Sequence, residues 1–132
     1  MARPRGRTRR CSPAVIDGRR AKAEEFWTAA CETDTLHPDD NSDAVIQLCI
    51  LAGIAAADVI CCVRLGEHAD GQAHTAATGL LAKVDPKLAR SLETLLSQKT
   101  DSAYRDKPSS SAKRRAAKRA AEDLMVAARS NR

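Results

Sequence analysis

The sequence has very few aromatic residues, and this limits the kind of core that it can build. Its 132 residues include one Phe, one Trp and one Tyr, at Phe26, Trp27 and Tyr104. Alanine and leucine must supply most of the packing. Burial of apolar surface stabilises a fold by roughly 25 cal/mol per Å², and an alanine side chain buries little area. We expect such a bundle to be only marginally stable alone, and therefore expect a homodimer, in which a second copy adds buried surface.

The sequence also lacks the spacings that usually mark metal and catalytic sites. Its five cysteines are odd in number and form no C-x-x-C pair, and no H-x-x-x-H pair occurs. We therefore predict neither a metal site nor a cofactor. His68 and His74 are interpreted as solvated residues around a turn. No cysteine stands in a recognisable pattern with a histidine and a positioning acid, so the chain is not expected to be a cysteine-dependent enzyme.

No apolar run follows the N-terminal arginines, so no signal peptide is expected. Cys49, Cys61 and Cys62 lie inside an apolar stretch and are interpreted as small buried hydrophobes. This use of cysteine favours a reducing, cytoplasmic location.

Basic charge is concentrated at the two ends of the chain. Residues 31–98 hold ten acids against four bases, so the middle carries −6 although the whole chain carries +5. Residues 1–12 contain a Pro, a Gly and five arginines, with almost nothing to bury, which predicts a disordered basic arm. These arginines are Arg3, Arg5, Arg7, Arg9 and Arg10. Residues 13–130 are predicted to form one helical-bundle domain.

Helix signals dominate the rest of the chain, with no β-alternation and no hairpin dipeptide. We expect helices over about 13–31, 44–65, 71–84 and 86–104, and from Ser110 or Ser111 onward, with a loop at 33–43 and a break at 107–110. Asp85-Pro86 is the clearest helix start, because it pairs an N-cap with a proline in the first turn. The pattern predicts an all-α, up-and-down bundle of four to five helices.

The helix over 44–65 is apolar nearly all round, with Ser42 or Asp43 as its cap and Gly66 at its end. Such a helix is either the centre of a bundle or a membrane span. Asp58 interrupts the apolar run, so we expect a central helix and no membrane. A buried carboxylate costs several kcal/mol unless it is paired. Lys99 and Tyr104 are the expected donors, and the alternative is a pocket whose ligand supplies the donor.

The last predicted helix carries a basic stretch that includes Arg114, Arg115 and Lys118. This stretch is either a solvated helix face or a face that contacts phosphate, together with the arginine arm. The lack of aromatics argues against base stacking, so any nucleic-acid contact should be electrostatic and weakly sequence-specific.

Four segments together resemble the HEPN superfamily of small helical bundles: AVIQLCILAGIAAADVICCVRLGEH, HTAATGLL, LETLLSQKTDSAYRD and AAKRAAEDLMVAA. The resemblance covers roughly residues 20–128. It rests on an Ala-rich central helix with an internal acid, a Leu-Leu-x-x-Lys helix that ends in Tyr, and an Ala-rich final helix. It implies a four- or five-helix bundle, commonly a dimer. Many such proteins act in RNA cleavage, toxin–antitoxin pairs or phage defence, and others are non-catalytic binding partners.

Catalytic members carry an Arg and a His with four to six residues between them, at the start of a late helix. No histidine follows Arg105, and Arg64 and His68 have only three residues between them. The sequence therefore predicts a non-catalytic, HEPN-like binding or regulatory module with an RNA or toxin–antitoxin partner. One alternative is a metal-independent ribonuclease in which Arg64, His68, Tyr104 and Arg105 meet across a dimer. Another is an electrostatic nucleic-acid-binding protein that uses its two basic ends.

Overall fold

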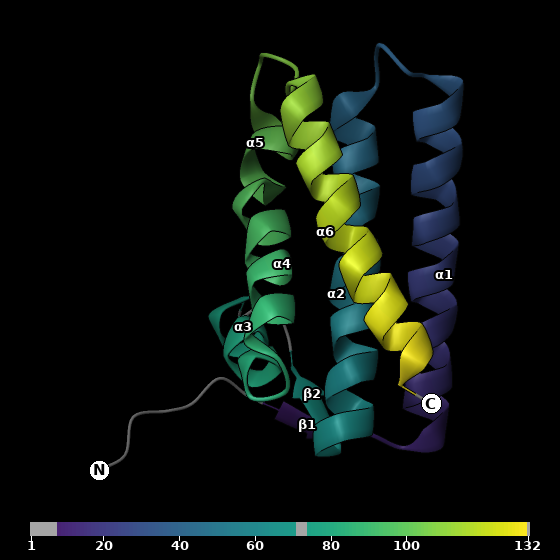
Figure 1. The fold of residues 1–132 in the computed structure, drawn as a ribbon, viewed down its shortest axis with the longest axis vertical. Coiled ribbons are helices and arrows are strands. Elements are labelled where there is room, and N and C mark those ends of the chain that lie inside the picture. Colours follow the sequence, from purple (N-terminus) through teal and green to yellow (C-terminus); the bar gives the residue numbers. More distant parts are fainter. Residues whose placement is uncertain (1–7, 71–73, 132) are drawn as a thin grey trace.

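The computed structural model describes residues 8–70 and 74–131, and these form an all-α bundle, as the sequence predicts. The elements are β1 (Thr8–Arg10), α1 (Pro13–Leu36), α2 (Ser42–Leu65), β2 (Glu67–Ala69), α3 (His74–Ala82), α4 (Pro86–Ser97), α5 (Lys99–Tyr104) and α6 (Ser111–Ser130). In Figure 1, α6 crosses in front of α2, between α4 and α1. The strands and α3 lie at the lower end of the view, and α5 lies at the upper end.

Helix α2 is the centre of the bundle, which confirms the prediction of a central helix. It is long and apolar enough to span a membrane, but 78% of its most apolar stretch is buried inside the protein. Helices α1, α4 and α6 all pack against it (Figure 1). Gly53 lies at a close contact with α4, since a Cβ added there would stand 2.3 Å from Cδ1 of Leu95. The absence of a side chain at this position lets α4 approach α2.

Helix α1 is longer than predicted, because it continues to Leu36 and the connection to α2 shrinks to residues 37–41. The Thr33 hydroxyl donates to the Ala29 carbonyl oxygen at 2.8 Å, so this polar residue is accommodated inside the helix. Helix α2 has Asn41 as its N-cap residue, in the left-handed region at φ 59°. The predicted caps, Ser42 and Asp43, instead lie in its first turn.

The helix predicted over 86–104 is broken at Gln98 into α4 and α5. Near the break, the side-chain nitrogen of Gln47 on α2 donates to the Lys99 carbonyl oxygen at 2.9 Å and to the Ser102 hydroxyl at 2.7 Å. These tertiary hydrogen bonds hold α5 against α2.

The prediction of a disordered arm is wrong for residues 8–12, and residues 1–7 lie outside the described part. Thr8–Arg10 pair with Glu67–Ala69 as an antiparallel two-stranded sheet. The next residue, Cys11, forms a disulfide with Cys62 on the last turns of α2. Cys62 is buried, as predicted, but its disulfide with Cys11 was not predicted. Cys49 and Cys61 are free and buried, as predicted.

Candidate functional site

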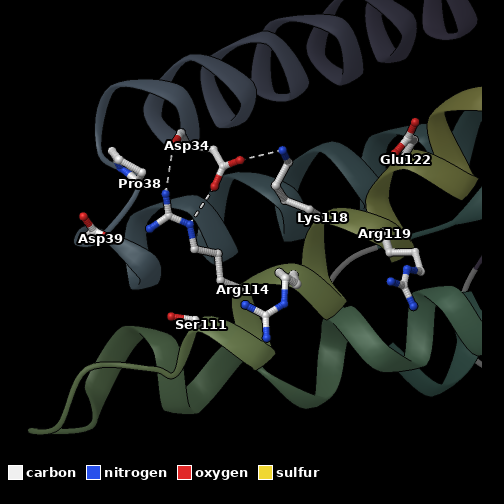
Figure 2. A pocket seen from close by; sticks show the side chains of 9 residues that line it. Asp34, Pro38, Asp39, Ser111, Arg114, Lys118, Arg119 and Glu122 are labelled. Carbon is white, nitrogen blue, oxygen red and sulfur yellow. Dashed lines mark hydrogen bonds and ion pairs between the residues drawn. The ribbon is translucent and has the colours of Figure 1, made fainter.

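A groove of about 580 Å³ lies between the first half of α6 and the end of α1 (Figure 2). We call it the α6 groove. Its lining residues are Asp34, Pro38, Asp39, Ser111, Arg114, Arg115, Lys118, Arg119 and Glu122. Four of these residues are bases and three are acids. The groove therefore includes the three bases that the sequence singled out on α6: Arg114, Arg115 and Lys118.

Arg114 was predicted to lie on a solvated or phosphate-contacting face, but its side chain is only 5% exposed. Its Nε donates to Oδ1 of Asp34 at 2.6 Å, and its two terminal nitrogens donate to the carbonyl oxygens of Asp34 (3.2 Å), His37 (2.5 Å) and Asp40 (2.5 Å). The guanidinium thus satisfies one carbonyl in the last turn of α1, which the helix itself leaves unpaired, and two in the connection to α2. Because its donors are used within the protein, Arg114 is not a candidate for binding phosphate.

The burial of Arg114 follows from the face that α6 presents to α2. The buried stripe of α6 includes Ala117, Ala121 and Leu124, which lie three, seven and ten residues after Arg114. Ala116, one residue before Ala117, lies outside this stripe and is exposed. A helical wheel centred on Ala117 and Ala121 would have placed Arg114 inside.

Lys118 is also held by an acid. Its Nζ lies 2.6 Å from Oδ2 of Asp34, so one carboxylate binds both bases (Figure 2). The hydrogen bond from Lys118, followed by the one from Arg114, lowers the pKa of the Asp34 carboxyl despite a penalty from burial. The same bond raises the pKa of Lys118. Lys118 is therefore a paired cation in this structure.

Arg115 and Arg119 behave differently. Both are exposed, and they lie four residues apart on α6, so they occupy the same side of the helix. Both line the α6 groove. Within the described part of the chain, neither side chain has a hydrogen bond or an ion pair. Arg115 was predicted from the sequence, whereas Arg119 was not, although it belongs to the same basic stretch.

Strand β1, which carries Arg9 and Arg10, lies at the other end of the bundle from the start of α6 (Figure 1). Nε of Arg9 forms an ion pair with Asp70 at 3.1 Å. Arg10 is exposed and lies opposite Glu67 in the strand register. Arg3, Arg5 and Arg7 are outside the described residues. The described bases of β1 and α6 therefore do not form one continuous surface.

Asp58 is buried as predicted, with 8% of its surface exposed, but its predicted donors are wrong. Its carboxylate pairs with Nε of Arg19 on α1 at 3.5 Å. Tyr104 is 82% exposed, at the end of the bundle where α5 lies. Lys99 lies beside Gln47, about three helical turns along α2 from Asp58. Helix α1 packs extensively against α2, and the donor comes from α1.

Burial raises the pKa of the Asp58 carboxyl, and the charges of Arg19 and then His68 oppose this shift. His68 is buried, contrary to the prediction of a solvated histidine, and its Nδ1 lies 2.8 Å from the Ala69 carbonyl oxygen. The side chain of His74 is outside the described part.

The four residues of the ribonuclease alternative do not meet within one chain. Arg64 and His68 lie at the β2 end of the bundle, whereas Tyr104 and Arg105 lie at the α5 end (Figure 1). Arg105 is ion-paired with Asp101 at 3.3 Å. Among the described residues, no group of three or more His, Cys, Asp or Glu side chains is placed to hold a metal ion.

Comparisons with protein-family models, with curated proteins and with solved structures find no match for this chain. The HEPN resemblance therefore stays a prediction.

Proposed function

We propose that this chain is a non-catalytic, HEPN-like binding module that holds the phosphodiester backbone of RNA in the α6 groove. One observation carries the proposal: Arg115 and Arg119 line the groove together, and neither has a charged or hydrogen-bonding partner among the described residues. Exposed guanidinium groups without carboxylate partners are suited to pair with phosphate oxygens.

The other bases support this arrangement without binding the ligand. Arg114 and Lys118 share the carboxylate of Asp34, which fixes the groove wall and neutralises part of their charge. Arg115 and Arg119 then supply the positive charge that remains for a ligand. Glu122 and Asp39 also line the groove and repel phosphate. The balance predicts weak, salt-sensitive binding of a backbone rather than tight binding of a compact anion.

None of the described residues that line the groove has an aromatic side chain on which a base could stack. RNA bound there would be recognised through its backbone and with little sequence preference. The ribonuclease alternative has less support, because its four residues lie at opposite ends of one chain and would need a second copy to meet.

The test is a binding titration of a fluorescent single-stranded RNA across a series of salt concentrations. The double variant Arg115→Gln/Arg119→Gln should bind roughly tenfold more weakly at 50 mM salt, and the slope of log affinity against log salt should fall by about 1.4, since each lost phosphate contact removes about 0.7 for a single strand. Glu122→Gln should strengthen binding, because it removes a negative charge from the same groove. Lys22→Gln/Lys83→Gln removes two exposed charges elsewhere and serves as the matched control.

Equal affinity for wild type and for Arg115→Gln/Arg119→Gln would reject the groove as the site. Equal loss in the Lys22→Gln/Lys83→Gln control would show that only net charge matters. A single-stranded DNA of the same sequence separates backbone binding, which both ligands share, from recognition of the RNA 2′-hydroxyl. The RNA should remain intact during the assay, and its cleavage would favour the ribonuclease alternative.

A further inference from the structure

Strand β1 is held to the bundle by few noncovalent contacts. All three of its residues are exposed, so it buries no side chain. It pairs over three residues with β2, and the backbone N–H of Cys11 donates to the Gly66 carbonyl oxygen at 3.1 Å. The ion pair between Arg9 and Asp70 is largely exposed and contributes little. A two-stranded ribbon of this kind is at best marginal in water.

A disulfide next to β1 attaches this strand to the bundle more firmly than these noncovalent contacts do. The Cys11–Cys62 disulfide joins two residues that are 51 apart in sequence, with their Cα atoms 5.6 Å apart. Cys62 is buried on α2, whereas Cys11 is only half-buried. The cysteine on the β1 side of the bond is thus the more exposed of the two residues.

The two buried free thiols, Cys49 and Cys61, are poorly suited to attack this bond. Burial raises the pKa of both Cys61 and Cys49 to about 12, so almost none of either thiol is ionised near neutral pH. Since the thiolate is the species that attacks a disulfide, exchange with the neighbouring Cys61 is suppressed. These two buried thiols therefore do not compete for the Cys11–Cys62 pairing near neutral pH.

We infer that the Cys11–Cys62 disulfide is a redox clasp, which a dithiol reductant opens to release β1 from β2 while the helices stay folded. One reductant thiolate attacks the Cys11 sulfur, and the Cys62 sulfur leaves as a thiolate and takes up a proton. The second reductant thiol then attacks the mixed disulfide and frees Cys11. Two electrons pass from the dithiol, which becomes a disulfide, to the protein. Release separates Arg9 from Asp70 and Arg10 from Glu67.

This reading reconciles the disulfide with the reducing compartment that the sequence favours, because intracellular disulfides are commonly transient or redox-sensing. It does not depend on RNA binding, so the two proposals can fail separately.

The test is hydrogen–deuterium exchange on the full chain, purified without reductant and then treated with dithiothreitol. Reduction should speed exchange of the Cys11 amide at least tenfold, while far-ultraviolet circular dichroism keeps its helical signal. Cys11→Ser should reproduce the fast exchange without reductant. Cys31→Ser, at a half-buried cysteine outside the disulfide, should exchange like the untreated protein.

Three outcomes would overturn the clasp. The first is equal Cys11 exchange before and after reduction, which would show that β-pairing alone holds the strand. The second is loss of the helical signal on reduction, which would make the bond a staple of the whole bundle. The third is a count of five thiols, rather than three, when the unreduced protein is denatured and titrated.

Discussion

Replacing Arg114 by methionine should be strongly destabilising, because this side chain joins α6 to the end of α1. The replacement keeps much of the volume but removes every donor. It leaves the carbonyl oxygens of Asp34, His37 and Asp40 without their partner and removes one of the two cations that bind the Asp34 carboxylate.

The magnitude follows from the burial and number of these bonds. Hydrogen bonds that involve a charged group contribute about 1.5–3 kcal/mol each, and breaking a buried ion pair costs about 3–5 kcal/mol. Lys118 still binds Asp34, and water can reach the exposed residues His37 and Asp40. The lower part of the range for a buried ion pair therefore applies. We expect a loss of about 3–4 kcal/mol in the free energy of unfolding, from a total of about 5–15 kcal/mol.

Urea denaturation followed by circular dichroism measures this loss directly, and the melting temperature should fall by about 10–15 °C. Arg114→Lys should recover less than half of the loss, because an ammonium group cannot form the planar fork of a guanidinium. Arg115→Met, at the adjacent exposed position, should stay within about 0.5 kcal/mol of wild type. A change below 1 kcal/mol for Arg114→Met would refute our account of how α1 ends.

The remaining predictions concern the buried acid, the closest helix contact, the buried thiols and assembly. The raised pKa of Asp58 means that the native state holds its proton to higher pH than the unfolded chain, so this group lowers stability as pH rises from about 4 toward neutrality. Asp58→Asn should remove that fall and be at least as stable as wild type at pH 7, as measured by urea titrations at several pH values. Gly53→Ala should cost about 1–3 kcal/mol, measured by the same titration, because its Cβ would overlap a leucine side chain. Iodoacetamide at pH 7 should leave Cys49 and Cys61 unlabelled in the native protein, as mass spectrometry can check. Light scattering at micromolar concentration should report about twice the 14.2 kDa chain mass, and a monomer would reject the predicted homodimer.

Local chemistry determined the parts of this protein that the sequence predicted well. Ser12, Asp85 and Ser110 each accept a hydrogen bond from a backbone N–H in the first turn of the helix that follows. Gly66 ends α2 in the left-handed conformation, at φ 79°. These interactions span only a few residues, so sequence position alone specifies them. The apolar composition of α2 likewise placed it at the centre of the bundle, because a helix that is apolar nearly all round must be covered by other helices.

The tertiary structure decided which side chain meets which. Two of these contacts join residues on different helices. Arg114 on α6 binds the end of α1, and Arg19 on α1 pairs with Asp58 on α2. The Cys11–Cys62 pairing has the same origin, since it requires the N-terminal segment to return to the end of α2. An Ala-rich helix has small side chains on more than one face, so its pattern does not fix the rotation of the helix about its axis. Arg114 is buried and its neighbour Arg115 is exposed, so turning α6 about its axis by one residue would exchange their environments. Only the packing of α6 against α2 sets this rotation.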